Sequence, residues 1–497
     1  MRLRPVPGNL RQSVLCLAGL LSNTACKTAG PPAPVAPGPV AGPVAAPAVD
    51  RAGNAGSAGP PAANPPSPLR ETPAVAQFSA WLAAFNSADR GALVAFHQQY
   101  FPYQVASDVV GSIDRELRLR KGTGGFEPAK REEASELRVV VLLKARNAPG
   151  FARAVMEVET AAPHRVARLD LEKIATPDEF LAPDERAGGQ LDAARRRRLI
   201  DGIARALRAQ YVFPEVAERM IGALDDAAAR GAFDSIDRGP AFVAAVSRVL
   251  HEVSHDSHLR FEFGRKPRIR SGEAPLAEQM KWARDKDFGL GTVERLQGNV
   301  ARVEIFAFLP PELAGDAIAE AMTRVADADA LIVDLRENHG GTPAAVALVA
   351  SYLFDPTPVH LNDMFKRDTG ATIESWTLPQ VRGTRFGGGK PVFVTTSKGT
   401  FSGGEELAYD LTCLRRAVIV GETTGGGANP TGPPNELDDW FRIFVPWGRP
   451  INPITKTNWE GVGVTPDVAV PASAALEEAH RRALQEIARR KGAGSRS

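Results

Sequence analysis

Residues 391–411 read PVFVTTSKGTFSGGEELAYDL, and the interpretation of the whole chain starts from this stretch. The apolar run 392–394 predicts a short buried strand. Leu407 and Leu411, four residues apart, predict a helix. Ser402 therefore lies where a strand passes into a helix, and there free backbone N–H groups point the same way as an exposed side chain.

Two interpretations of Ser402 follow from this position. A serine nucleophile fits, because the oxyanion that it creates needs hydrogen-bond donors close by. A simple helix N-cap also fits, with Gly403 and Gly404 easing the turn. By itself the stretch favours the cap, so the rest of the chain has to decide between them.

The composition sets limits on the class of protein. A chain of 497 residues exceeds the usual size of one domain, and its 43% apolar content is that of a globular protein. The formal net charge of +2 gives no reason to expect a nucleic-acid partner. The cysteines Cys16, Cys26 and Cys413 are too few for a disulfide framework.

The N-terminus has the pattern of an export signal over residues 1–26. Arginines precede the apolar run 13–21, which is too short to span a bilayer. The segment then resembles a lipoprotein cleavage box ending at Cys26, although Asn23 stands where an aliphatic residue is usual, and ordinary signal cleavage is the alternative. Residues 27–74, rich in Ala, Pro and Gly, predict an extended tether. We therefore expect an exported protein of the periplasm or cell envelope, anchored through a lipid on Cys26.

A first folded unit is predicted over residues 75–181. An amphipathic helix over 78–101 precedes three strand-like runs spaced as in a meander, at 137–143, 154–160 and 166–171. Helices followed by strands predict a small α+β domain. The segment FSAWLAAFNSADRGAL resembles the start of the cone-shaped SnoaL-like fold.

Residues 190–287 predict a helical subdomain. Within it, His251 to His255 read HEVSH, the H-E-x-x-H pattern of zinc peptidases. On a helix, the apolar stripe of this segment would leave both histidines on the solvent side, and no third ligand is evident. We therefore expect no metal, and keep a zinc peptidase as a lesser alternative. His258, with Ser257 beside it at a loop-to-strand junction, is better placed for function.

Residues 288–490 alternate strands and helices and predict a layered α/β domain. In such a domain ligands bind where loops leave the strand ends. The Gly-rich loops 336–341 and 421–427 lack the nucleotide-binding patterns, so we expect no cofactor.

Four segments together carry a family resemblance: DLRENHGG (334–341), TFSGGEELAYDL (400–411), RAVIVGETTGGGANP (416–430) and NPITKTNWEGVGVTPD (452–467). With DSHL at 256–259, they resemble the tail-specific, or C-terminal processing, serine peptidases. The likeness runs over about 199–488 and is greatest to the branch of the tricorn core and the interphotoreceptor retinoid-binding protein. It implies a layered α/β serine-peptidase core with a helical N-terminal subdomain. No segment is long enough for the PDZ domain that processing peptidases often insert.

The resemblance also implies a catalytic set. Processing peptidases use a Ser–Lys pair, but Gly427 stands in the place of that lysine, and Lys398 is a minor rival base. The tricorn-like branch uses a serine, a histidine, a second serine and a glutamate. The matching positions here are Ser402, His258, Ser257 and Glu460. The implied oxyanion hole is formed by the backbone N–H of Gly403 with that of Gly340 or Gly341.

The resulting hypothesis is an exported serine endopeptidase acting on a peptide or protein substrate, with Ser402 as nucleophile and His258 as general base. The alternative is a non-catalytic module that binds hydrophobic ligands on the same fold. Glu460 has a plain structural alternative as a surface turn residue. Asp334 and Arg336 are interpreted as an ion pair that fixes a loop. The oligomeric state stays open.

Overall fold

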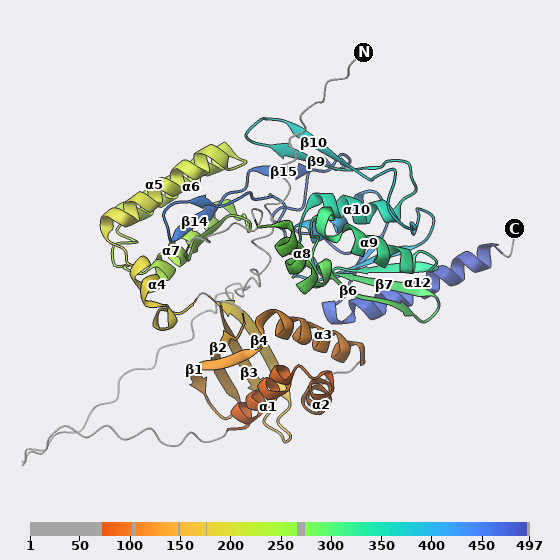
Figure 1. The fold of residues 1–497 in the computed structure, drawn as a ribbon, viewed down its shortest axis with the longest axis horizontal. Coiled ribbons are helices and arrows are strands. Elements are labelled where there is room, and N and C mark those ends of the chain that lie inside the picture. The colour runs from red at the N-terminus through yellow and green to blue at the C-terminus, as the bar shows by residue number, and fades with distance from the viewer. Residues whose placement is uncertain (1–71, 102–105, 148–149, 175, 266–273, 495–497) are drawn as a thin grey trace, which may run out of the picture.

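The computed structural model describes residues 72–101, 106–147, 150–174, 176–265 and 274–494 (Figure 1). The predicted signal segment and nearly all of the predicted tether lie outside these residues. Within them, no helix combines the length and the apolar character needed to cross a bilayer.

The N-terminal unit is α+β, as predicted. The helices α1 (Pro73–Ser87), α2 (Arg90–Tyr100) and α3 (Ala106–Thr123) precede an antiparallel sheet in the order β1-β2-β3-β4. Its strands are β1 (Phe126–Ala134), β2 (Arg138–Ala145), β3 (Phe151–Val158) and β4 (Val166–Ile174). The likeness to a SnoaL-like domain stays a prediction.

The single helix predicted over 78–101 was wrong. Ala88 adopts a left-handed conformation that ends α1. The Asp89 side chain then accepts the N–H groups of Gly91 and Ala92 and begins α2. An N-cap acceptor of this kind starts a new helix because it satisfies donors that have no partner within the helix.

The helical unit contains α5 (Ala193–Gln210), α6 (Pro214–Ala229) and α7 (Gly239–Ser254), preceded by the short α4 (Pro183–Gly188). The strand β5 (Arg260–Phe263) follows α7 and pairs antiparallel with β14 (Phe441–Phe444). β14 also pairs with the short β13 (Asn435–Glu436). The side chains of Phe441 and Ile443 complete the core of this unit. A late segment of the chain thus holds the strand that begins two residues after His258, a pairing that the sequence did not predict.

The α/β body is built on a six-stranded sheet in the order β16-β12-β11-β8-β7-β6. Its strands are β6 (Leu290–Leu296), β7 (Val300–Ile305), β8 (Ala330–Asp334), β11 (Val392–Thr396), β12 (Val418–Gly421) and β16 (Val468–Ala469). The neighbours from β7 to β16 pair in parallel, whereas β6 is antiparallel. The layered α/β prediction is confirmed.

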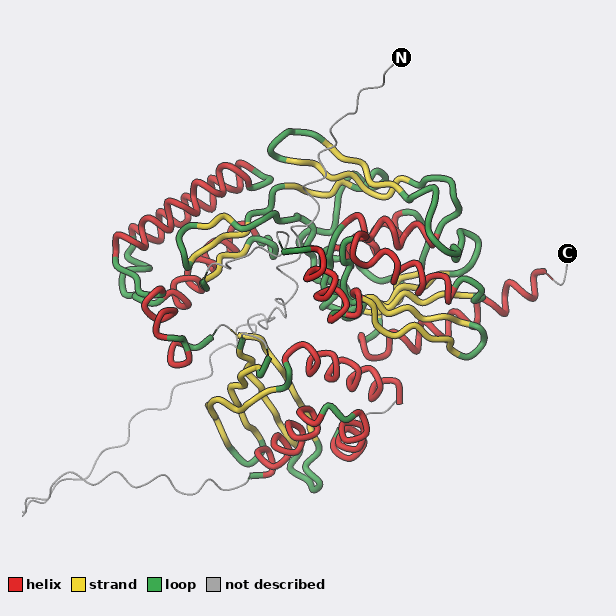
Figure 2. Tube along the Cα trace, viewed as in Figure 1, coloured by secondary structure: helices red, strands yellow, loops and turns green. Residues whose placement is uncertain are grey.

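Alternate residues of the central strands face two helical layers, because side chains along a strand point to opposite faces. Val392 and Val394 pack with α9 (Pro311–Val325), α10 (Pro343–Leu353) and α11 (Gly403–Cys413). Phe393 packs on the other face against α12 (Ala472–Gly494). The helical layers are visible on either side of the sheet in Figure 2.

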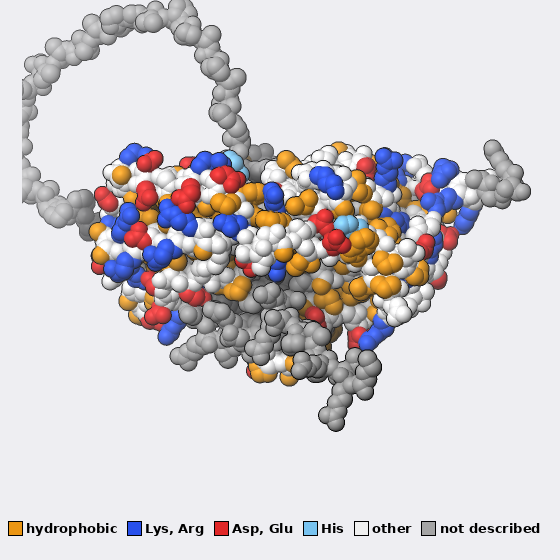
Figure 3. All heavy atoms as spheres, turned by 90° about the horizontal axis from the view of Figure 1, so that it is seen from above, with side chains coloured by type: hydrophobic (Ala, Val, Ile, Leu, Met, Phe, Trp, Pro, Cys, Tyr) orange, Lys and Arg blue, Asp and Glu red, His pale blue; other side chains and the backbone are white. Residues whose placement is uncertain are grey.

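A smaller sheet in the order β10-β9-β15 completes the fold. It consists of β9 (His360–Lys366), β10 (Thr372–Trp376) and β15 (Gly448–Ile451), and the chain after β15 leads to Glu460. On the face shown in Figure 3, acidic and basic side chains are interspersed with apolar ones.

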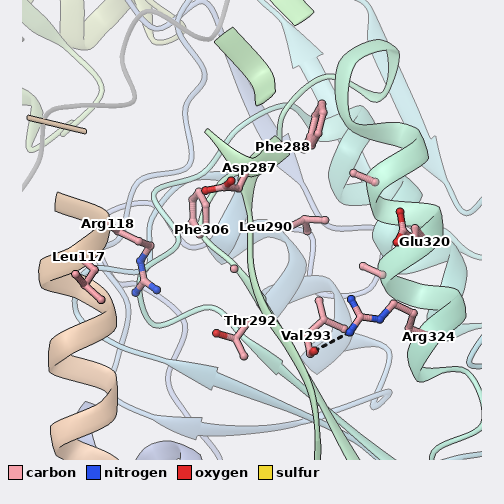
Figure 4. A pocket seen from close by; sticks show the side chains of 13 residues that line it. Leu117, Arg118, Asp287, Phe288, Leu290, Thr292, Val293, Phe306, Glu320 and Arg324 are labelled. Atoms are coloured by element: carbon pink, nitrogen blue, oxygen red, sulfur yellow. Dashed lines mark hydrogen bonds between the residues drawn. The ribbon is translucent and has the colours of Figure 1, made fainter. Parts of the chain in front are cut away.

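Helix α3 of the N-terminal unit contacts the α/β body through three ion pairs. Arg115 pairs with Glu337 at 2.8 Å, Arg118 with Glu304 at 3.1 Å, and Lys121 with Asp287 at 2.6 Å. Beside them, a cavity of about 560 Å³ lies between α3, β6 and α9 (Figure 4). The residues that line this cavity do not include Ser402 or His258.

Candidate active site

Ser402 lies between β11 and α11 in a strained backbone conformation. Its φ of 53° and ψ of −121° fall outside the regions that a side-chain-bearing residue ordinarily adopts. Neighbouring bonds hold it there: Phe401 N–H donates to Asn338 O at 2.9 Å, and Ser402 N–H donates to Glu405 Oε2 at 2.9 Å. Ser402 occupies the N-cap position of α11, as the simpler interpretation predicted, but its hydroxyl also meets a histidine.

Glu405 fixes the loop that carries Ser402. Its buried carboxylate accepts bonds from Ser402 N–H, Gly426 N–H at 2.6 Å, Gly427 N–H at 2.9 Å and the Thr424 hydroxyl at 2.5 Å. Burial raises the pKa of Glu405 to about 7, and the bonds from its four donors oppose that rise. The sequence analysis missed this residue, although the S-x-x-E spacing of a capping box pointed to it.

His258 and Ser402, 144 residues apart in the chain, meet in space: Nε2 of the ring lies 3.1 Å from Ser402 Oγ. The ring stacks on Phe401 with a centroid distance of 4.7 Å. Only 7% of the His258 surface is exposed. Burial, helped by the charge of Arg260, lowers the pKa of His258 to about 3, so the ring is neutral near pH 7.

Two carboxylates lie behind His258. A ring nitrogen of His258 and one carboxylate oxygen each from Asp256 and Glu460 lie within 4.8 Å of one another. Glu460 Oε2 accepts the N–H groups of Ala428 at 2.5 Å and Asn429 at 2.9 Å. Its other oxygen, Oε1, is buried without a partner among the described residues, as is His258 Nδ1. Burial and the charge of Asp256 raise the pKa of Glu460 to about 8.

Asp256 is a second residue that the sequence analysis missed. It is 1% exposed, and its Oδ1 accepts the backbone N–H of His258 at 2.9 Å. An aspartate bonded to the N–H two residues on is a common turn, so the D-S-H triplet carried a usable signal. Ser257, between these residues, is half-buried, and the described part of the chain shows no hydrogen bond from it to His258 or Glu460.

The glycines beside Ser402 bring two backbone segments into contact. A Cβ on Gly341 would lie 2.1 Å from Phe308 O, and one on Gly340 would lie 2.7 Å from Ser402 Cβ. Neither position has room for a side chain. The Gly340 N–H donates to Asn338 Oδ1 at 2.8 Å. Among the described residues, the N–H groups of Gly341 and Gly403 have no acceptor.

The surroundings of Gly427 leave no space for a lysine, or for any other side chain, at this position. A Cβ at this position would lie 2.1 Å from the Phe401 ring and 2.9 Å from His258 Cε1. A side chain at 427 and the observed His258 would therefore occupy the same space. Lys398 is 67% exposed and lies 3.9 Å from Glu422, so it points into solvent beside a carboxylate.

The other residues that the sequence singled out do not take part in the contacts of Ser402 and His258 described above. His251 and His255 are exposed, and His255 ends α7 in a left-handed conformation. Within the described ranges, the one cluster of three potential metal ligands is Asp256, His258 and Glu460. The ion pair of Asp334 with Arg336 is confirmed at 2.8 Å, and Arg302 joins it at the same distance.

Comparison with known proteins identifies the α/β body. Residues 299–470 match the model of peptidase family S41. The chloroplastic carboxyl-terminal-processing peptidase 2 of Arabidopsis thaliana is 29% identical over 174 residues, which are 33% of this chain and 31% of that protein. The chain therefore spans about a third of the length of this curated relative.

Three peptidases of known structure align with this chain. The photosystem II D1 C-terminal processing protease is 16% identical, with a TM-score of 0.37 over 59% of this chain and 97% of its own. A putative peptidase from Parabacteroides merdae is 15% identical, with a TM-score of 0.43 over 58% and 96%. The tricorn protease is 13% identical, with a TM-score of 0.39 over 72% and 41%. Residues 299–470 of this chain thus match peptidase family S41, and this match supports a serine-type peptidase domain.

Proposed function

We propose that this protein is an exported serine endopeptidase that cleaves peptide bonds with Ser402 as nucleophile and His258 as general base. The observation that carries the proposal is the 3.1 Å contact between Ser402 Oγ and His258 Nε2. That distance is within the reach of direct proton transfer, and a nucleophile beside its base is the arrangement that acyl transfer requires.

The reaction follows from these contacts. Ser402 Oγ attacks the carbonyl carbon of the scissile bond while His258 Nε2 takes the hydroxyl proton. His258 then gives this proton to the leaving amine, and a water molecule, deprotonated by the same ring, hydrolyses the acyl-enzyme. The oxyanion is bound by the N–H groups of Gly403 and Gly341, since that of Gly340 is already bonded to Asn338.

Glu460 sets the tautomer of His258 in this proposal. Its Oε2 already accepts two backbone N–H groups, which leaves the unpartnered Oε1 to bond the ring. An ionised Oε1 accepts Nδ1–H and leaves Nε2 free to take the serine proton. A protonated Oε1 donates to Nδ1 instead and moves the ring proton to Nε2, which blocks the base. Ser257, the second serine of the implied catalytic set, is assigned a supporting role beside His258 and Glu460.

Export and anchoring belong to the same proposal. Residues 1–26 have the pattern of a signal, and Cys26 would carry the lipid. Such an anchor with the tether 27–74 would hold the peptidase near a membrane surface and its peptide or protein substrates. Metabolic labelling with a radioactive fatty acid tests the anchor: the label is expected in the wild-type protein and absent in Cys26→Ser.

A peptide library read by mass spectrometry tests the activity itself. The purified wild-type protein is expected to produce defined cleavage products that Ser402→Ala does not produce. Both proteins should unfold at similar temperatures, because the change removes one half-buried hydroxyl. Cleavage that persists in Ser402→Ala would refute the assignment. Tight binding of an apolar ligand with no cleavage would favour the hydrophobic-ligand module.

A further inference from the structure

We propose that Asp256 is a positioning residue for the general base: it holds the His258 segment against the loop beside Ser402 and supplies the negative charge that faces Glu460. This inference rests on the proposed peptidase function and assigns a role to a residue outside the predicted catalytic set. Asp256 lies in the turn between α7 and β5, two residues before His258.

The carboxylate of Asp256 joins three separate parts of the chain. Its Oδ1 accepts His258 N–H at 2.9 Å. Its Oδ2 accepts the Tyr211 hydroxyl at 3.2 Å, at the end of α5, and Asn429 Nδ2 at 3.0 Å, in the loop after β12. The Asn429 N–H is in turn bonded to Glu460. Asp256 thus ties the helical unit to the loop that passes His258 in the α/β body.

The His258 ring depends on this support. Within the described residues, the polar contact of the ring is to Ser402, while Nδ1 has no partner. Stacking on Phe401 restrains the orientation of the His258 ring plane, but it does not fix the position of the backbone that carries the ring. The backbone N–H bonded to Asp256 therefore sets where the imidazole meets the serine.

Burial and hydrogen-bond donors act in opposite directions on the charges of Asp256 and Glu460. Burial raises the pKa of Asp256, and its three donors, a backbone N–H, a phenol and an amide, oppose that rise because each favours the ionised form. Glu460 receives two donors. The neighbouring charges are Glu405 from α11, which acts on Glu460, and Arg260 from β5, which acts on His258. In its ionised form, Asp256 makes the proton on Glu460 harder to remove.

Two substitutions separate holding from charge. Asp256→Ala removes the clamp. Asp256→Asn keeps the shape and removes the charge, and the Asn429 amide can turn so that its unpartnered Oδ1 accepts the new N–H₂ group. Asp226→Asn, an exposed aspartate on α6, is the matched control. Cleavage of a library-derived peptide gives kcat and KM across pH, and ¹⁵N NMR of the His258 ring gives its tautomer without any need for turnover.

In Asp256→Ala, we expect kcat to fall about 100-fold, the usual effect of a displacement near 1 Å, with KM changed less than about 3-fold. In Asp256→Asn, the limb of the pH profile that reports Glu460 should move to lower pH, a shift that a merely structural role would not cause. The inference is overturned if both variants keep the wild-type kcat and pH profile. It is also overturned if the ¹⁵N signals of His258 are unchanged in Asp256→Ala. A wild-type protein without turnover whose His258 signals still respond to these substitutions would refute the peptidase assignment alone.

Discussion

The substitution Gly427→Ala tests whether His258 owes its place to an empty position in the neighbouring loop. The added Cβ would lie 2.1 Å from the Phe401 ring, whereas ordinary contacts begin at 3.4 Å, so the ring must move by about 1.3 Å. The same Cβ would lie 2.9 Å from His258 Cε1 and displace that ring by about 0.5 Å. Because His258 stacks on Phe401, both shifts move Nε2 relative to Ser402.

The expected loss for a displacement of this size is about 100-fold in kcat. Overpacking should also lower the free energy of unfolding by about 1–3 kcal/mol. Initial rates with a cleaved peptide give the first quantity, and urea unfolding followed by circular dichroism gives the second. Gly389→Ala is the control, since nothing lies within 4 Å of its Cβ position. If Gly427→Ala cleaves at the wild-type rate, the account of why a glycine stands there is wrong.

Four further predictions concern Glu460, Glu405 and His251. Peptidase activity should rise with pH through about 8, the pKa of Glu460, because its ionised form selects the useful tautomer, and a pH–rate profile that is flat between 6 and 9 contradicts this. The folded-state pKa of Glu460 lies above its ordinary 4.5, so its contribution to stability is complete below pH 4.5 and is lost as pH rises through about 8. The pH dependence of the unfolding free energy should therefore be weaker in Glu460→Gln than in the wild type. Glu405→Gln turns an N–H₂ group toward two buried donors, which then lack an acceptor at a cost in stability of about 1–3 kcal/mol each. This substitution should lower the melting temperature, and an unchanged melting curve would disprove the prediction. His251→Ala should keep the wild-type cleavage rate with and without a chelator, and a loss of activity would revive the zinc alternative.

Local sequence patterns predicted the helices and strands whose buried apolar residues recur at regular spacing along the chain. The run 392–394 lies in β11, and Leu407 and Leu411 lie in α11. Both elements were predicted because the periodicity of a strand or a helix can be recognised within a few consecutive residues. β1 was missed since its sequence FEPAKREEA is exposed along most of its length and lacks an apolar alternation. The pairing of β14 with β5 joins segments far apart, which no window of sequence reports.

The site divides in the same way. Local pattern pointed to Ser402 and His258, family resemblance assigned roles to them and to Glu460, and the fold brings these three positions together. Asp256 and Glu405 escaped because an acidic residue in a turn or first helical turn is common on surfaces. Their importance arises from burial and from donors supplied by distant loops, such as Asn429 for Asp256 and Gly426 for Glu405.

The central claim is that His258 activates Ser402, and the rate of covalent labelling by a fluorophosphonate measures it most directly. Mass spectrometry of the digested protein should place a single label on Ser402. The labelling rate should fall by on the order of 1,000-fold in His258→Ala, since nucleophile and base act as one unit. A label on another residue, or a rate in His258→Ala equal to that of the wild type, would contradict the account.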